Sequence, residues 1–80
     1  MTNITAIQSS TYKIISECLG IPESSITPDS SLDSLGADSL DVIEIVMALE
    51  DRMGIEISDA EFEACESVRD VIELVERLRP

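Results

Sequence analysis

Aliphatic side chains recur at helical spacing in three segments of this 80-residue chain, and that pattern limits the folds it can adopt. The segments are Ile4–Leu19, 39–53 and 67–78, where apolar residues return mostly every three or four positions. Only Tyr12 and Phe62 are aromatic, so the core has to be built from aliphatic side chains. Short amphipathic helices bury their apolar stripes by packing on one another. The sequence therefore predicts an all-α fold, a small four-helix bundle with a short third helix.

Capping and breaking residues set the limits of the expected helices. Gly20 ends the first helix, with Pro22 just beyond it, and Asp38 and Gly54 are the N-cap and the stop of the second. The expected limits are Ile4–Leu19, about Ser39–Met53, Ser58 or Asp59 to about Ala64, and about Ser67–Leu78. A single domain, residues 1–80, accommodates all four helices.

The segment between the first two helices, GIPESSITPDSSLDSLGA, is rich in Ser, Pro and Asp. A structureless loop of this length is uncommon inside a compact domain. Four apolar residues interrupt it, which a free linker does not need: Ile21, Ile26, Leu32 and Leu35. We therefore expect a long ordered loop that these residues pin to the core.

Acidic residues outnumber basic residues by 17 to 5, which gives a net charge of −12. Such a charge repels phosphate backbones and anionic membrane surfaces over a Debye length of about 8–10 Å. It attracts basic protein surfaces and speeds encounters with them. We therefore expect protein partners, no nucleic acid and no membrane insertion. The same charge also serves to keep the protein dissolved.

Cys18 and Cys65 lie far apart and form no CxxC pair, so the sequence signals neither a zinc site nor a thioredoxin-type motif. Reduced thiols that pack as small apolar groups are the expected state. The stretch MTNITAIQSS lacks a basic region followed by an apolar run, and no segment reaches the length of a membrane span. These features predict a cytoplasmic location.

The second helix carries apolar residues on two faces. At about 100° per residue, one sector of its helical wheel holds the residues that we expect to face the core: Val42, Ile45, Val46, Leu49 and Met53. A second stripe lies toward the opposite side, beside Glu44 and Asp51, and consists of Leu40, Ile43 and Met47. One interpretation is a bundle that surrounds the helix and buries both stripes. The other is an exposed docking surface, apolar at its centre and acidic at its rim, where Met adds adaptability.

Ser39 lies in the expected first turn of this helix, within the stretch LGADSLDV. A catalytic serine needs a base, most often histidine, and the chain has no histidine. Free backbone N–H groups and the positive end of the helix dipole favour an anion at this place, so a phosphate ester on the hydroxyl is well positioned. Serine is also common at helix starts for its propensity alone. These residues by themselves leave both readings open.

The stretch LGADSLDVIEIVMALEDRMGIEIS closely resembles the acyl carrier proteins of fatty acid and polyketide synthesis. The preceding ITPDSSL is similar to the loop of that family, and the resemblance extends more weakly over essentially the whole chain. The triplet Asp38–Leu40 is short, but together with Leu35–Ala37 before it and the helix after it the match is specific. On this resemblance the chain is identified as a member of the family, a free-standing carrier and not an enzyme.

The resemblance implies that 4′-phosphopantetheine is attached to Ser39 by a phosphopantetheinyl transferase that uses coenzyme A and magnesium. The arm then carries acyl intermediates as thioesters and presents them to other enzymes. In the family Asp38 lies beside the attachment point and can help to hold the transferase's metal. The implied partners are the transferase and the acyl-loading, condensing and other synthase enzymes, and we expect the carrier itself to be a monomer. The residues implied to meet these partners are Leu40, Asp41, Ile43, Glu44, Met47 and Asp51.

Three residues depart from the pattern of the bacterial fatty acid carriers. Met53 stands where those proteins usually have Phe, Phe62 where they have a small residue, and Cys65 where they have a buried Ile. In that family the inner walls near these positions enclose the acyl chain. We hypothesise that Phe62 narrows the cavity, while Met53 and Cys65 reshape it. The expected cavity residues are Val46, Leu49, Met53, Phe62, Cys65 and Val71.

Several alternatives stay open. The pathway is either fatty acid synthesis or polyketide and other specialised acyl transfer. Another class of function is an acidic helical regulatory or interaction protein without a prosthetic group. The stretch DSSLDSLGADSLD is dotted with acids, but it lacks the loop pattern and the closing Glu of an EF-hand. An enzyme is disfavoured, because the sequence offers no histidine, no metal-ligand cluster and no Gly-rich phosphate loop.

Overall fold

The computed structural model describes residues 4–79, with the side chains of residues 6–79. Four α-helices and one short 3₁₀ helix form this part of the chain, which contains no strand. The elements are α1 (Ile4–Leu19), η1 (Glu23–Ser25), α2 (Ser39–Met53), α3 (Asp59–Glu63) and α4 (Val68–Leu78). The predicted all-α bundle with a short third helix is confirmed.

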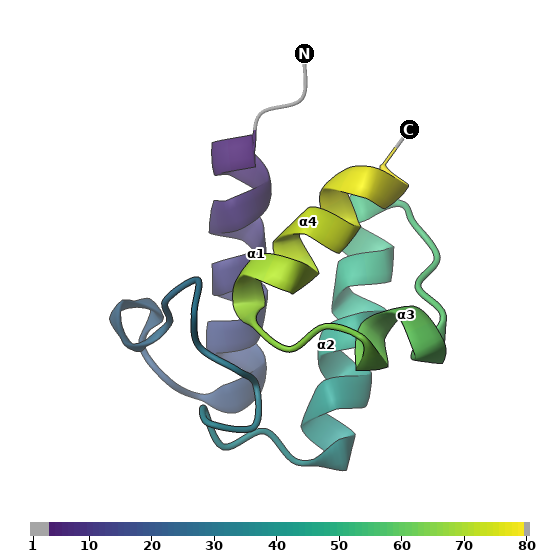
Figure 1. Cartoon of the computed structure of the whole chain (residues 1–80). Coiled ribbons are helices and arrows are strands. Elements are labelled where there is room, and N and C mark those ends of the chain that lie inside the picture. The colour runs from purple at the N-terminus through teal and green to yellow at the C-terminus, as the bar shows by residue number, and fades with distance from the viewer. Residues whose placement is uncertain (1–3, 80) are drawn as a thin grey trace.

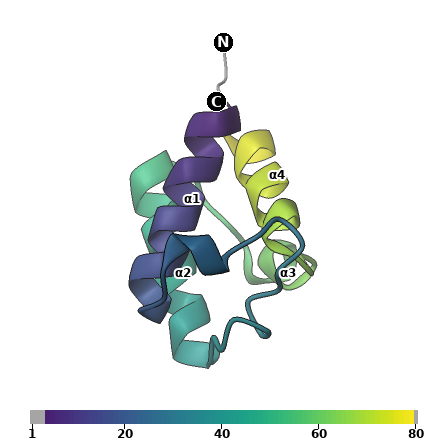
Figure 2. The same cartoon turned by 90° about the vertical axis from the view of Figure 1, so that its left-hand side faces the viewer.

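Helices α1 and α2 lie side by side and run in opposite directions, and α4 crosses them obliquely (Figure 1). The long connection between α1 and α2 wraps around the end of the bundle at which α2 begins (Figure 2). The first turn of α2 therefore lies far from the end where α1 begins and α4 ends. This arrangement leaves the start of α2 at an outer end of the molecule.

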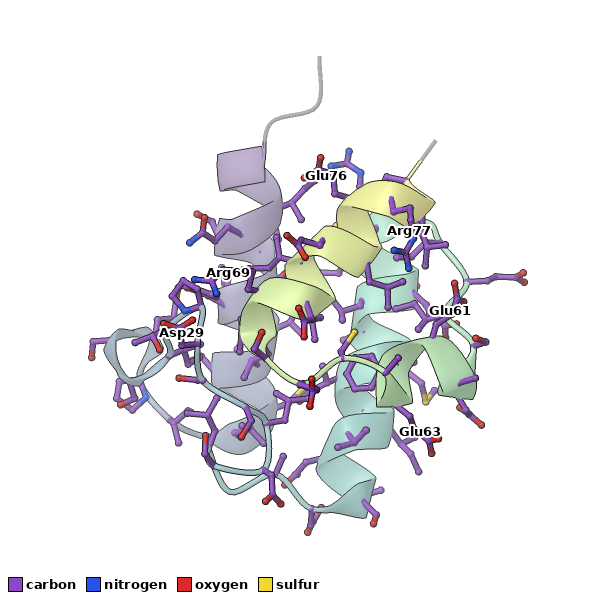
Figure 3. The ribbon with its side chains drawn as sticks, in the orientation of Figure 1. Asp29, Glu61, Glu63, Arg69, Glu76 and Arg77 are labelled. Atoms are coloured by element: carbon purple, nitrogen blue, oxygen red, sulfur yellow. The ribbon has the colours of Figure 1, made fainter. Side chains whose placement is uncertain are left out.

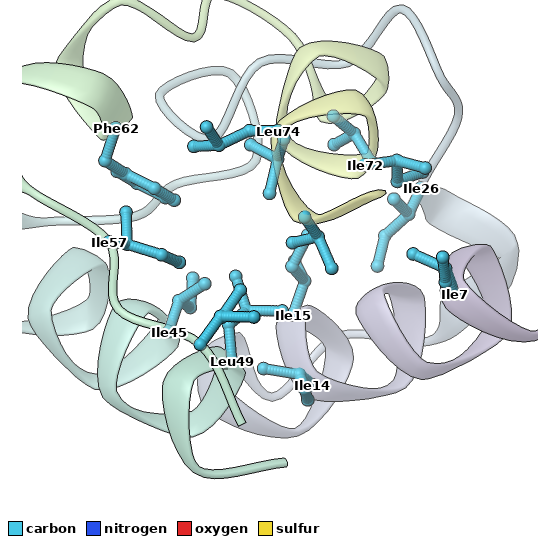
Figure 4. Packing of buried hydrophobic residues seen from close by; sticks show 14 residues of the cluster. Ile7, Ile14, Ile15, Ile26, Ile45, Leu49, Ile57, Phe62, Ile72 and Leu74 are labelled. Carbon is cyan, nitrogen blue, oxygen red and sulfur yellow. The ribbon is translucent and has the colours of Figure 1, made fainter. Parts of the chain in front are cut away.

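Helix α2 contributes the centre of the core. Ile45 and Leu49 are fully buried, and Val42, Val46 and Met53 pack half-buried against the same cluster. All five belong to the sector that the helical wheel assigns to the core. Figure 4 shows the buried pair facing the aliphatic side chains of α1.

In two places the core contains buried residues that the sequence analysis does not predict. Helix α4 buries Leu74 in addition to the expected stripe, so its apolar face is wider than the wheel suggests. The connection between α2 and α3 adds Ile55 and Ile57, which are 8% and 7% exposed. The expected stripe of α4 is buried at Val68, Val71, Ile72 and Val75 and half-buried at Leu78.

The helix limits follow from the predicted caps. Asp38 caps α2, which ends at Gly54 in a left-handed conformation with φ of 65° that glycine adopts without strain. Of the two candidates for the third helix, Ser58 is the N-cap, and its hydroxyl accepts a hydrogen bond from the Glu61 N–H. Ser67 is the N-cap of α4, so this helix begins one residue later than predicted.

The loop between α1 and α2 is ordered by contacts with the core, as expected. Ile26 is buried, and Ile21, Leu32 and Leu35 pack half-buried against the core cluster. A helical turn, η1, forms part of this connection.

Backbone hydrogen bonds join the same loop to the start of α4. The Val68 N–H donates to the Ser30 carbonyl at 2.8 Å, and the Arg69 N–H donates to the Pro28 carbonyl at 2.9 Å. The Arg69 guanidinium also lies 2.8 Å from the Asp29 carboxylate (Figure 3). Because the first N–H groups of a helix have no partner within the helix, these carbonyls satisfy groups that would otherwise be free. The loop is thereby held beside the start of α4.

Candidate functional site

Ser39 is the first residue of α2, and its side chain is exposed. Its hydroxyl makes no hydrogen bond with any residue that the structure describes. The first N–H groups of α2 and the positive end of the helix dipole lie at this position. Because α2 begins at an outer end of the bundle (Figure 1), the hydroxyl is open to another protein.

Asp38 and Asp41 form a reciprocal capping box around Ser39. The Asp41 N–H donates to Asp38 Oδ1 at 2.9 Å, and the Asp38 N–H donates to Asp41 Oδ2 at 3.1 Å. Both carboxylates therefore stabilise the start of α2, where a negative charge is favourable. The capping box uses only one carboxylate oxygen of Asp38, so the other is free to face an incoming group. The local sequence fixes the backbone around Ser39 and leaves its side chain unengaged.

A cleft of about 610 Å³ opens directly beside Ser39. Its walls come from the start and middle of α2, from α3 and from the segment before α3, and they consist of Ala37, Asp38, Ser39, Val42, Ile43, Val46, Met47, Glu50, Ile57, Asp59, Phe62 and Glu63. The apolar side chains among them suit a hydrocarbon, while the carboxylates surround it with negative charge. Figure 3 shows one of these acids, Glu63, below α3 and beside α2. We call this space the outer cleft.

A second cavity of about 260 Å³ lies between the loop, α3 and α4. Its lining residues are Ser31, Leu32, Asp33, Val42, Phe62, Glu63, Cys65, Ser67 and Val71. Three residues, Val42, Phe62 and Glu63, line both spaces. We call this second space the inner cavity.

The second apolar stripe of α2 is exposed. Leu40, Ile43 and Met47 are 63%, 55% and 62% exposed, so the interpretation in which the bundle surrounds the helix is wrong. The reason is that the short α3 and the loop cover only part of α2 and leave this face open. Glu44 and Asp51 are exposed beside the stripe, whereas Asp41 is half-buried and engaged in the capping box.

The structure divides the six expected cavity residues into three groups. Val46 and Phe62 line the outer cleft, and Phe62, Cys65 and Val71 line the inner cavity. Leu49 and Met53 line neither space: Leu49 is fully buried in the core, and Met53 packs half-buried against it. Helical periodicity placed these two residues on the inward face, but that face meets α1 as well as the cavities.

Sequence reasoning missed Ile57 as a wall of the outer cleft. Ile57 directly precedes the N-cap Ser58, and Phe62 is the fourth residue of α3, which are the two positions of a hydrophobic staple. Both side chains line the outer cleft. The pattern was present in the sequence as an isoleucine before the Ser58–Glu61 capping box, and it would have paired Ile57 with Phe62.

Both thiols are free and half-buried. Burial is the main cause that raises the pKa of the Cys65 thiol, with a further contribution from the Asp70 carboxylate. Burial likewise raises the pKa of the Cys18 thiol, followed by the effect of the Glu44 carboxylate. The Cys65 thiol donates to the Glu61 carbonyl at 3.6 Å. Both thiols are therefore protonated near neutral pH and slow to react.

Within residues 4–79 no group of three or more His, Cys, Asp or Glu side chains is arranged to hold a metal ion. Among the same residues, no helix is both long enough and apolar enough to cross a membrane.

An exposed serine at the start of a helix, with a cleft beside it, fits a helical carrier domain to which another enzyme attaches a group. Comparison with known proteins agrees with this assignment. The family described as "Phosphopantetheine attachment site" matches residues 12–75, well over half of the chain. The chain belongs to this family, and it is a carrier rather than a catalyst.

Its fold is similar to that of a solved protein. The crystal structure of an acyl carrier protein from Thermotoga maritima superimposes with a TM-score of 0.79 and is 29% identical in sequence. The match covers 94% of this chain and 88% of that one. The resemblance to acyl carrier proteins that the sequence indicated is thereby confirmed.

Proposed function

We propose that this chain is an acyl carrier protein whose residues 1–80 act as one carrier domain, with 4′-phosphopantetheine on Ser39. The observation that carries this proposal is the exposed hydroxyl at the start of α2, next to the mouth of the outer cleft. The identity of the attached group follows from the family to which the chain belongs. Ser39 is the residue whose exposure and position suit the attachment of that group.

The described residues fit a phosphodiester at this place. The Ser39 oxygen is the attachment atom, and the first N–H groups of α2 favour the negative charge of the phosphate. Asp38 and Asp41 lie on either side and repel that charge, so the reaction requires a counter-charge during transfer. Asp38 is the residue of this chain that can help to hold the transferase's metal ion. The thiol of the group, when bound, supplies the thioester on which acyl intermediates are carried.

The outer cleft is the proposed site for the acyl chain. Val42 and Val46 on α2 and Phe62 on α3 offer it apolar walls in the cleft that Ser39 also lines. Burying a hydrocarbon against such walls removes it from water, and the gain grows with the apolar area that is buried. We therefore assign the acyl chain to this side of α2, with Cys65 and Val71 as residues of the inner cavity.

The exposed stripe of α2 is the proposed partner surface. Leu40, Ile43 and Met47 provide its apolar centre, and Asp41, Glu44 and Asp51 provide acidic groups around it. An apolar centre within a polar rim is the usual composition of a transient interface. The proposed partners are the phosphopantetheinyl transferase and the acyl-loading, condensing and other enzymes of fatty acid or polyketide-type synthesis, which approach with basic surfaces.

Two further parts of the proposal concern state and location. We propose a monomer, because each partner enzyme needs the stripe and the start of α2 uncovered. We also propose that the carrier works in the cytoplasm, since Cys18 and Cys65 are free thiols, the state that a reducing compartment maintains.

The attachment is tested by coexpressing the chain with a phosphopantetheinyl transferase and measuring the intact mass. We expect the wild-type chain to gain one phosphopantetheine and Ser39→Ala to gain none. Ser24→Ala is the matched control, because Ser24 is also exposed but lies in η1, away from the cleft, and this variant should gain the group as the wild type does. A folded wild-type chain that gains no mass would instead favour the acidic regulatory protein without a prosthetic group.

A further inference from the structure

We infer that Phe62 is a partition that separates the outer cleft from the inner cavity and thereby keeps an acyl chain in the outer cleft. This inference rests on the proposed function, because it needs an acyl group attached through Ser39. It assigns to one side chain the role of deciding which of the two spaces an acyl chain occupies.

Shared walls place Phe62 between the two spaces. Phe62, Val42 and Glu63 are the three residues that line both, while Ser39 lines only the outer cleft and Cys65 only the inner cavity. The arm is attached at Ser39, so the acyl group on its thiol meets the outer cleft beside Ser39 first. From the outer cleft, the way to Cys65 leads past the shared wall, where Phe62 is the largest apolar side chain.

Local structure holds Phe62 in position. Its side chain is only 7% exposed and belongs to the core cluster. The Phe62 N–H donates to the Ser58 carbonyl at 3.1 Å, and the Phe62 carbonyl accepts from the Cys65 N–H at 3.0 Å. Phe62 and Ile57 also occupy the two positions of the hydrophobic staple. Figure 4 shows the ring directed from α3 toward the interior. Moving it aside sacrifices buried aromatic contacts, so the partition resists displacement.

The outer cleft and the inner cavity differ in volume and in the residues that line them. The outer cleft, at about 610 Å³, is the larger, and its lining includes the acidic residues Asp38, Glu50, Asp59 and Glu63. The inner cavity, at about 260 Å³, adds the apolar walls of Leu32, Cys65 and Val71. A long acyl chain would bury more apolar surface if it also entered the inner cavity, but the Phe62 ring blocks the way from the outer cleft. The acyl chain is therefore held in the outer cleft, and any part of it that the cleft does not accommodate stays in water or on a partner enzyme.

Cys65 is a built-in reporter for this question. Its thiol lines the inner cavity and is half-buried, so an acyl chain that enters the cavity shields it from a small alkylating reagent. Cys18 lies in α1 and lines neither space, so it reports any general change in the fold. Burial raises the pKa of both thiols, and the alkylation rates are therefore compared at one mildly alkaline pH.

The experiment loads the full chain at Ser39 with arms that end in butyryl, octanoyl or palmitoyl groups through a non-hydrolysable amide. Alkylation of Cys65 by iodoacetamide, relative to Cys18, is followed by peptide mass spectrometry. In the wild-type chain we expect the ratio of the two rates to stay the same for all three groups. In Phe62→Ala the palmitoyl group should lower the relative rate at Cys65 by about tenfold, which corresponds to about 1.4 kcal/mol.

Two variants keep the result interpretable. Val46→Ala enlarges the outer cleft without touching the shared wall, so palmitoyl should leave Cys65 as reactive in this variant as in the wild type. Phe62→Leu keeps a buried apolar residue and serves if Phe62→Ala does not fold, which circular dichroism would show. When loaded with the palmitoyl group, Phe62→Leu should show partial protection of the Cys65 thiol from alkylation.

The possible outcomes test the Phe62 partition separately from the proposed carrier function. Protection of Cys65 by palmitoyl in the wild type would overturn the partition, and so would full reactivity of Cys65 in a folded Phe62→Ala carrier with palmitoyl. A failure of Ser39 to accept any arm would overturn the proposed function instead, and the intact mass distinguishes that result before any alkylation is measured.

Discussion

Leu40 and Leu49 are the same residue type on the same helix, and the fold gives them opposite environments. Leu49 is 0% exposed at the centre of the core, and Leu40 is 63% exposed beside Ser39. An exposed leucine contributes little to folding, because its side chain stays in water in the folded and the unfolded chain alike. Its place next to Ser39, with Ile43 and Met47 one turn and two turns further on, is the composition of a docking surface rather than of a core.

Leu49→Ala should lower the free energy of unfolding by about 2–5 kcal/mol, because it removes buried contacts and leaves a void. Leu40→Ala is the matched control on the same helix, and it should change the stability by no more than about 0.5 kcal/mol. Urea unfolding followed by circular dichroism measures both values. Equal losses in the two variants would contradict the assignment of the two faces.

Residue-level prediction from the sequence succeeded where a single helix decides the outcome. The wheel of α2 assigns Ile45 and Leu49 to the core face and Leu40 to the opposite face, because one axis and one period fix those directions, and the structure shows the first pair buried and Leu40 exposed. It could not separate Val46, which lines the outer cleft, from Leu49, which packs in the core. That difference depends on where α3 and the loop lie relative to α2, and no local pattern contains this information.

At the scale of the element, α2 combines a fixed start with an open face. Asp38 and Gly54 were assigned from the sequence as its limits, and both were confirmed, because a cap acts through hydrogen bonds within the same few residues. The capping box stabilises the first turn without using the Ser39 side chain. Farther along, the exposed acids Glu44 and Asp51 lie on the same helix. Helix α2 therefore carries all six residues of the proposed partner surface.

Charge reversal on α2, Glu44→Lys or Asp51→Lys, should slow modification by the phosphopantetheinyl transferase. We expect kcat/KM to fall by about tenfold at low ionic strength, because the acidic field no longer steers a basic partner. The difference from the wild type should shrink as salt is added. Steady-state kinetics at several salt concentrations measures this, and circular dichroism should be unchanged.

Glu76→Lys is the control for that measurement, since it makes the same change in net charge at an exposed site on α4 (Figure 3). A reduction equal to that of Glu44→Lys would mean that net charge, and not the face of α2, governs the encounter. A loss of the helical circular dichroism signal in the α2 variants would mean that Glu44 and Asp51 stabilise the fold rather than bind partners.

At the scale of the whole molecule, a net charge of −12 is confined to a small volume. The radius of gyration is 11.3 Å and the principal extents are 32 × 25 × 20 Å. At an ionic strength near 0.01 M the Debye length is about 30 Å, so charges across the entire molecule repel one another. Near 0.15 M it is about 8 Å, and most of these pairs are screened.

Stability should therefore increase when salt is added. Among the described residues two ion pairs oppose this trend, Arg52 with Glu17 at 3.4 Å and Arg69 with Asp29 at 2.8 Å. Both are exposed, and such pairs contribute only about 0–1 kcal/mol each, so the loss of their attraction is small beside the relief of the repulsion. We expect Tm to rise by several degrees between low and physiological ionic strength, since about 1 kcal/mol corresponds to about 4–8 °C for a domain of this size.

The comparison that isolates the repulsion is a variant with less net charge. Glu56→Lys with Glu76→Lys changes two exposed acids on different parts of the surface, and each exchange raises the net charge by two units. If repulsion sets the salt dependence, Tm of this variant at low ionic strength should exceed that of the wild type, and its rise with potassium chloride should be smaller. Calorimetry over a series of chloride concentrations measures both slopes. A wild-type Tm that stays constant or falls as salt is added would mean that the exposed ion pairs outweigh the repulsion. The acidity would then be free of any cost to stability, and its use in steering partners would be independent of how the fold is held together.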